Sequence, residues 1–250
     1  MLHTKNFLKI LLFSFFLLLP SLAMAEGGYT VAYDALLHNY VHAGKKAGIH
    51  ANLVDYDAWA RDPRHVQAMK ALTEVDVTKL NPQALKTYWI NAYNLLTIDL
   101  IVRNPDVKSI KDLGTLLQSP WKAHSWKIAG RELTLDDIEH GILRKMGDPR
   151  IHMAIVCASL SCPDLRNEVY LPERLDTQLN DQTQKFLATT TKGLRVGNSG
   201  LTLSPIFKWF AEDFGSDKGV LAFIRKNGPT VSGGTSVSDY FDYDWNLNKP

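Results

Sequence analysis

Two cysteines near the middle of the chain are the residues best suited to chemistry. Cys157 and Cys162 stand in the segment DPRIHMAIVCASLSCPDLR, residues 148–166. The apolar run at residues 151–156 predicts a short buried strand that ends at Cys157, and small residues follow it. A cysteine attacks as its thiolate, so a neighbouring cation or base must lower a thiol pKa that is normally about 8.5.

Two histidines are the nearest candidates for that base. His152 would lie on the predicted strand with Cys157 at an odd separation, which places the two side chains on opposite faces. His140 belongs to a separate predicted helix and is freer to approach. The spacing therefore favours His140, and Glu139 could orient its ring, although adjacent side chains diverge by about 100° on a helix.

The same two cysteines could instead be joined in a disulfide that staples their loop. Four residues separate Cys157 from Cys162, so the pair is not the two-residue redox motif. The sequence leaves the disulfide and the free thiol open. We predict no metal and no cofactor, because paired Cys-x-x-Cys or His-x-x-x-His spacings are lacking.

The first 25 residues have the pattern of a cleavable secretory signal. Lys5 and Lys9 precede an apolar run at residues 10–19, Pro20 breaks the run, and residues 23–25 give the small-x-small cleavage pattern. The run is shorter than the about 20 residues needed to cross a bilayer, so we expect no membrane span after cleavage. The protein should work in the periplasm or outside the cell, where disulfides can form.

Charge and composition argue against a nucleic-acid partner. The chain has 28 basic and 26 acidic residues, but Lys5 and Lys9 would leave with the signal, so the exported chain is formally neutral. It carries no basic stripe interleaved with aromatic residues. A hydrophobic content of 45% and an aromatic content of 10% are typical of an ordered globule.

The hydrophobic periodicity predicts one α+β domain, with a helical N-terminal half packed on a small antiparallel sheet. The clearest helix starts at Asn81 and Pro82, which are typical of a cap and a first helical position. The patterns predict helices over residues 30–43, 63–75, 82–102, 135–146, 172–189 and 219–226, a further helix starting at Ser204-Pro205, and hairpins over residues 124–133 and 194–203.

Two asparagines stand within the long apolar helix. Asn91 and Asn94 are three residues apart and share a face. They could tie the helix to a loop or contact a substrate. Because buried polar groups normally find partners inside the protein, the structural network is favoured. Trp209 in the later segment 201–215 is interpreted as a core residue.

Five segments together resemble the domain-of-unknown-function 547 family. They are YWINAYN, LTLDDIEHGILR, DPRIHMAIVCASLSCPDL, LSPIFKWFAEDFG and YDWNLN, in this order. The resemblance covers about residues 80–248, so we predict a family-like domain at 80–250 after a helical lead-in at 26–79. It implies that the cysteine segment, the asparagine pair and the Glu139–His140 pair are signature features, and that Asp213 and Asp244 belong to the pattern. The residue types are also loosely similar to papain-like and transglutaminase-like hydrolases, an analogy that does not give function.

Our first hypothesis is a thiol-dependent hydrolase or acyltransferase that acts on peptide-like amides. Cys157 would be the nucleophile and His140 the base, with Glu139 or Asp244 orienting the imidazole.

Backbone amides near Ser159 and Ser161 would then stabilise the oxyanion, and Asn91 and Asn94 would contact the substrate, a small molecule or peptide. The alternative is a non-enzymatic exported binding or assembly module in which a Cys157–Cys162 disulfide is structural.

Overall fold

The computed structural model describes residues 28–232 and 235–250. The predicted secretory signal at residues 1–25 lies outside the described part. Within it, no helix combines the length and the apolar character that crossing a bilayer requires.

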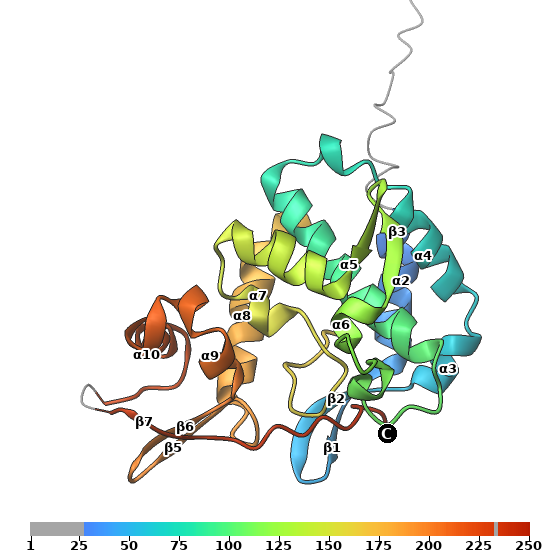
Figure 1. The fold of residues 1–250 in the computed structure, drawn as a ribbon. Helices are drawn as coiled ribbons and strands as arrows, with labels where there is room; N and C mark the ends of the chain where they lie inside the picture. The colour runs from blue at the N-terminus through green and yellow to red at the C-terminus, as the bar shows by residue number, and fades with distance from the viewer. Residues whose placement is uncertain (1–27, 233–234) are drawn as a thin grey trace, which may run out of the picture.

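Helix α5 (Pro82–Val102) is the centre of the fold (Figure 1). The Asn81 side chain accepts hydrogen bonds from the backbone N–H groups of Gln83 and Ala84, and Pro82 needs no such partner. Residues 87–101 are all buried, so every face of the helix packs against the protein. The predicted start, end and burial of this helix are confirmed.

The N-terminal part surrounds α5 with three helices and one hairpin. Helix α2 packs against α4, and strands β1 and β2 pair antiparallel along their whole length. The turn between them is Ala47-Gly48, both with positive φ, as a tight hairpin turn requires. These elements are α2 (Gly28–Tyr40), β1 (Val41–Lys46), β2 (Ile49–Val54), α3 (Tyr56–Arg61), α4 (Arg64–Thr73) and η1 (Val77–Lys79).

Two predictions for this part are therefore wrong. The first helix does not reach residue 43, because Val41 already pairs with Val54 in the hairpin. The lead-in is consequently not purely helical. A short hairpin with few apolar residues gives only a weak alternating hydrophobic pattern. The helical pattern of the residues before it masks that alternation.

The segment after α5 contains two short helical turns and leads to the second hairpin and to a helix of unusual winding. Strands β3 and β4 pair antiparallel around Ala129-Gly130, which confirms the predicted hairpin. The next helix is wound as a π-helix, and the Thr134 hydroxyl accepts a hydrogen bond from the Asp137 N–H at its start. The elements are η2 (Ile110–Leu113), α6 (Pro120–Ala123), β3 (Ser125–Ile128), β4 (Arg131–Thr134), η3 (Asp137–Leu143) and η4 (Arg144–Met146).

The segment before Cys157 is a helical turn and not the predicted strand. Helix α7 (Ile151–Ala154) starts from the turn at Asp148, whose backbone carbonyl accepts a hydrogen bond from the Ile151 N–H. A short run of apolar residues fits a buried helical turn as well as a buried strand, because neither has an exposed face to reveal its period. The alternation argument that separated His152 from Cys157 therefore does not apply.

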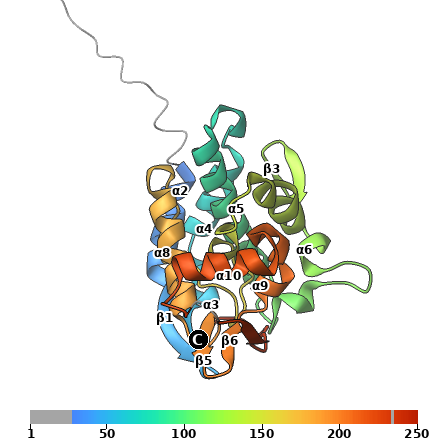
Figure 2. The same cartoon turned by 90° about the vertical axis from the view of Figure 1, so that its left-hand side faces the viewer.

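The C-terminal part contributes the third sheet and a second helical layer (Figure 2). Strand β6 pairs antiparallel with β5 and parallel with β7. The expected single antiparallel sheet is thus wrong: the described residues form three small separate sheets, one of them mixed. The elements are η5 (Pro172–Arg174), α8 (Leu175–Ala188), β5 (Leu194–Gly197), β6 (Gly200–Leu203), α9 (Ile206–Trp209), η6 (Ala211–Phe214), α10 (Ser216–Asn227) and β7 (Val237–Tyr240).

Two hydrophobic clusters hold this α+β domain together. The larger one surrounds α5 and includes both cysteines. The smaller one joins α8, α9 and α10 to strands β5 and β6. Tyr243 packs against both clusters, so the C-terminal segment lies where they meet. That junction also contains the candidate site.

Candidate active site

Backbone hydrogen bonds from the end of the chain hold the cysteine loop, residues 157–162. The backbone N–H groups of Leu160 and Ser161 donate to the carbonyls of Asn246 and Asp244, at 2.9 and 3.2 Å. In return, the Asn248 N–H donates to the carbonyl of Ala158 at 3.0 Å. We call residues 243–248 the C-terminal strap. It fixes the shape of the loop and brings Tyr243 against the sulfurs.

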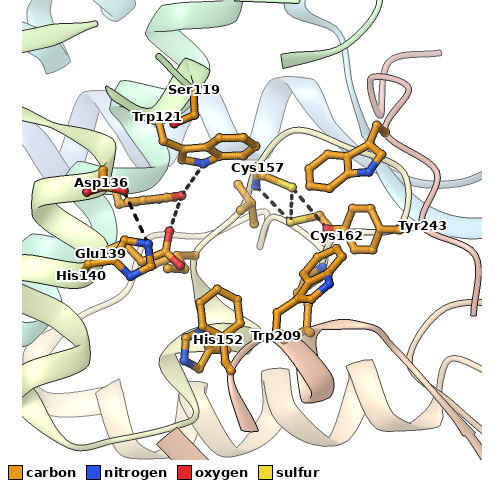
Figure 3. A pocket seen from close by; sticks show the side chains of 17 residues that line it. Ser119, Trp121, Asp136, Glu139, His140, His152, Cys157, Cys162, Trp209 and Tyr243 are labelled. Atoms are coloured by element: carbon orange, nitrogen blue, oxygen red, sulfur yellow. Dashed lines mark hydrogen bonds and ion pairs between the residues drawn. The ribbon is translucent and has the colours of Figure 1, made fainter. Parts of the chain in front are cut away.

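The Cys157 sulfur sits among three polar neighbours, of which Figure 3 shows Cys162 and Tyr243. It lies 3.0 Å from the Cys162 sulfur, 3.0 Å from the Ser159 hydroxyl and 3.3 Å from the Tyr243 hydroxyl. The Cys162 sulfur also accepts a hydrogen bond from the Cys157 N–H at 3.0 Å. The two cysteines are free, so the disulfide that the sequence left open is absent from the structure.

These contacts shift the pKa values of the two thiols in opposite directions. Burial raises the pKa of Cys157, but its hydrogen bonds with Cys162, Ser159 and Tyr243 outweigh burial and lower the pKa to about 6. Burial and the neighbouring Cys157 raise the pKa of Cys162 well above the usual value. Cys157 is therefore the more acidic thiol of the pair and the one that forms a thiolate.

The π-helix η3 supplies the opposite wall of the site (Figure 3). Glu139 is buried, and its carboxylate accepts a hydrogen bond from the Tyr93 hydroxyl at 2.9 Å. The Trp121 indole N–H donates to the same hydroxyl at 3.1 Å. Burial raises the pKa of Glu139, and the negative charge of Cys157 raises it further. The pKa of Glu139 therefore lies above its ordinary value, although the Tyr93 hydrogen bond and the nearby Arg144 oppose the rise.

His140 pairs with Asp136 and not with either predicted acid. Its Nε2 lies 3.6 Å from the Asp136 carboxylate, one helical turn away. Its Nδ1 lies 3.0 Å from the Arg144 guanidinium, which can only donate, so neutral His140 carries its proton on Nε2. Asp244 instead accepts hydrogen bonds from Asn246 within the C-terminal strap. The predicted orienting role of Asp244 is therefore wrong.

His152 lies on the same cavity but is held as a neutral, packed ring. It stacks on Phe210 with the ring centroids 4.1 Å apart, and its Nε2 lies 2.6 Å from the Asp213 carboxylate. Arg144 binds the same carboxylate with two hydrogen bonds. Burial lowers the pKa of His152 to about 4, against the opposing effect of Asp213. No hydrogen bond links His140 or His152 to Cys157.

The two walls enclose a cavity of about 340 Å³. Cys157, Cys162 and Tyr243 line one side, and Glu139 and His140 line the other (Figure 3). The remaining lining is mainly aromatic and includes Trp121, Trp209 and Trp245. A thiolate thus faces a carboxyl and an imidazole across a pocket that a small acyl group or peptide side chain could enter.

The backbone amides expected to form an oxyanion hole are already used. The N–H groups of Leu160 and Ser161 bond to the C-terminal strap, and the Ser159 N–H is directed at the Cys157 sulfur. The Ser161 hydroxyl accepts a hydrogen bond from the Asp244 N–H. The predicted oxyanion role for this loop is wrong, because these donors stabilise the thiolate and the strap instead.

The two helix asparagines lie behind the cavity and do not line it. Asn94 donates to the Ala154 carbonyl and accepts from the Val156 N–H, both at 2.9 Å. Asn91 makes the same double contact with the backbone of Tyr170. Both side chains therefore position loops, and Asn94 holds the segment that delivers Cys157.

The sequence singled out no role for several residues that the fold brings to the site. Asp136, Tyr93 and Trp121 pack around the acidic wall, and Trp209, interpreted as core, is 48% exposed at the cavity. Tyr243 stands in a noted aromatic segment, but nothing local links it to a cysteine far away in sequence. The Asp136–His140 contact follows the i, i+4 spacing of a helix, whereas the contacts of Tyr243 and Trp121 join segments too far apart for any spacing rule.

Among the residues that the structure describes, no group of three histidine, cysteine or acidic side chains could hold a metal ion.

The fold and the site define a single-domain α+β protein with a buried, acidic thiol at a cavity. Residues 77–187, less than half of the chain, match a protein family described as protein of unknown function, DUF547, which supports the resemblance over this part of the chain. The match contains the asparagine pair, the Glu139–His140 pair and the cysteine segment, whereas the segments at 201–215 and 243–248 lie beyond it. Comparison with curated proteins found no match. Comparison with solved structures found none either, so the likeness to papain-like and transglutaminase-like folds remains a hypothesis.

Proposed function

We propose that this protein is an exported thiol-dependent hydrolase or acyltransferase that acts on peptide-like amides. The observation that carries the proposal is the Cys157 sulfur, which lies on a cavity wall with a pKa lowered to about 6. Such a thiol is largely thiolate at neutral pH and needs no imidazole to remove its proton. The activation expected from His140 is replaced by hydrogen-bond donors.

In the proposed reaction, the Cys157 thiolate attacks the substrate carbonyl carbon and forms a tetrahedral intermediate. The carbon–nitrogen bond then breaks, and the leaving amine takes a proton from the acidic wall, leaving a thioester on Cys157. Glu139 supports this role because burial raises its pKa and so favours the protonated acid. A water molecule or a second amine then attacks the thioester, returns a proton to Glu139 and releases the thiolate.

His140 is the second proton carrier on that wall. Its ring is partly exposed, and its Nε2 proton points towards Asp136 at the cavity. It can relay protons between Glu139 and solvent. His152 is too tightly held by Phe210 and Asp213 for this task, and we assign it a positioning role.

An activated acyl ester tests the proposal directly. Incubation with a p-nitrophenyl ester of a short acyl group should release nitrophenolate and leave an acyl adduct on Cys157, seen by intact mass and removed by hydroxylamine. Cys157→Ser should abolish the adduct, while Glu139→Gln should form it and resolve it slowly. Conversion of an amide library by the wild type then identifies the substrate.

The competing hypothesis is a non-enzymatic binding or assembly module. If the wild type forms no acyl adduct while Cys157 is readily alkylated, the acyl-transfer proposal is wrong. If Cys157→Ser also lowers the free energy of unfolding, the cysteine is structural and the module is favoured; normal folding with lost turnover supports the enzyme.

A further inference from the structure

A short loop projects from the body beside the candidate site (Figure 2). It comprises residues 114–119, between η2 and α6, which pack against each other. A Cβ atom added to Gly114 would lie 3.1 Å from Cδ of Pro120, so the loop leaves and returns at nearly the same point. We call it the projecting loop.

The tip of the projecting loop is apolar and fully exposed. Leu116 and Leu117 show relative exposures of 105% and 95%. The Thr115 hydroxyl accepts hydrogen bonds from the N–H groups of Leu117 and Gln118, and the Thr115 N–H donates to the Gln118 carbonyl at 2.8 Å. An internally bonded turn therefore holds the two leucines outwards.

This exposure is unusual within the described part of the chain. The other large, exposed aliphatic residues, Val31, Val66 and Val196, are separate in sequence and less exposed. Single exposed apolar residues need no explanation, but two adjacent ones on an ordered tip suggest an apolar environment.

Lysines surround the base of the projecting loop. Lys108, Lys111 and Lys122 flank it in sequence, and Lys122 is 58% exposed although it lies 3.7 Å from Asp136. The nearest acid within the flanking segment, Asp112, uses its carboxylate to accept backbone N–H groups. Residues 108–122 contain three lysines and one aspartate, so this segment carries a formal charge of +2, although the Lys111 ammonium lies 4.9 Å over the Trp245 ring.

We propose that the projecting loop docks the protein onto an anionic lipid surface. The leucines would enter the boundary of the acyl chains while the lysines meet the headgroups. A stable protein interface needs about 800 Å² on each partner, which a two-residue convex tip does not offer, whereas a bilayer accepts such a tip without a matching surface. Ser119 and Trp121, which follow the tip, line the cavity, so docking would bring the cavity to the membrane.

Vesicle co-sedimentation of the full chain tests this proposal. We expect binding to vesicles of phosphatidylcholine with phosphatidylglycerol, and weak binding to phosphatidylcholine alone. The double substitution Leu116→Glu with Leu117→Glu should lower the partition coefficient on anionic vesicles by about tenfold or more. The matched control, Val31→Glu with Val66→Glu, places the same two charges on exposed apolar positions of α2 and α4 and should bind like the wild type.

Three outcomes would overturn it. The first is that the wild type does not bind anionic vesicles. The second is that the leucine double variant binds as well as the wild type, and the third is that the valine double variant weakens binding as much as the loop change. All chains share the same N-terminus, so the comparison isolates the loop. The alkylation rate of Cys157 should be unchanged in the double variant, which keeps this test separate from that of the proposed function.

Discussion

The hydroxyl of Tyr243 lies 3.3 Å from the sulfur of Cys157, although the two residues are 86 positions apart. Burial raises the pKa of Tyr243 well above its usual value, so its hydroxyl keeps its proton and can donate it to the sulfur. The C-terminal strap therefore contributes directly to the acidity of a thiol in the middle of the chain.

Removing that donor should make Cys157 less acidic. Tyr243→Phe keeps the ring contacts with Trp209 and Trp245 but removes the hydroxyl. We expect the pKa of Cys157 to rise from about 6, by about one unit. The pH dependence of iodoacetamide alkylation measures it. Tyr240→Phe, outside the site, should leave the midpoint unchanged, and an unchanged midpoint in Tyr243→Phe would contradict the assignment.

The neighbouring sulfurs should form a disulfide readily when an oxidised thiol reagent is added. The Cys157 thiolate attacks the reagent disulfide and releases one reagent thiolate. Cys162, 3.0 Å away, loses its proton and attacks the mixed disulfide, releasing the second. Intact mass should show the loss of two hydrogen atoms and no retained reagent.

Cys162→Ala separates the two steps of this exchange. It should stop at the mixed disulfide, because no second thiol is within reach, and should retain one reagent group per chain. Rapid release of the reagent by Cys162→Ala would show that Cys162 does not resolve the bond.

Asn94 should be important for stability because it satisfies two buried backbone groups. Asn94→Ala leaves the Ala154 carbonyl and the Val156 N–H without their partner, which should lower the free energy of unfolding by about 3 kcal/mol. Asn104→Ala is the control: its side chain makes one bond, to the Leu100 carbonyl, and should cost about 1 kcal/mol. Urea unfolding measures both. Equal losses would contradict the bridging role of Asn94.

His152 should make the fold sensitive to acid. Its pKa is about 4 in the folded protein and about 6.5 when unfolded, so the unfolded chain takes up the proton first as the pH falls. Stability is fully present above about pH 6.5 and declines towards pH 4, by about 3 kcal/mol. Asp213, whose own pKa is lowered, adds to the loss at lower pH.

The acid dependence can be assigned by substitution. His152→Asn should flatten the stability profile between these pH values, whereas His38→Asn, on an exposed turn of α2, should preserve it. Thermal unfolding across this pH range is the measurement. A profile that stays steep in His152→Asn would place the acid sensitivity elsewhere.

Local patterns in the sequence were sufficient to predict the most regular elements. Asn81 and Pro82 mark the start of α5 because capping and proline preferences act over one helical turn. The hairpins around Ala129-Gly130 and Asn198-Ser199 are equally local. The same patterns could not distinguish a helical turn from a strand before Cys157, since both bury all their side chains there.

The sequence by itself determined the α+β class, the family resemblance that the match over residues 77–187 supports, and the segments that supply Cys157, Glu139 and His140 to the cavity. The tertiary structure alone decided which side chains contact one another in the site. Tyr243 reaches Cys157 because the strap pairs with the cysteine loop, and the Tyr93 hydroxyl reaches Glu139 because α5 packs against η3. Hydrogen bonds between distant segments leave no spacing in the sequence, so the partners that set a pKa become visible only when the chain is folded.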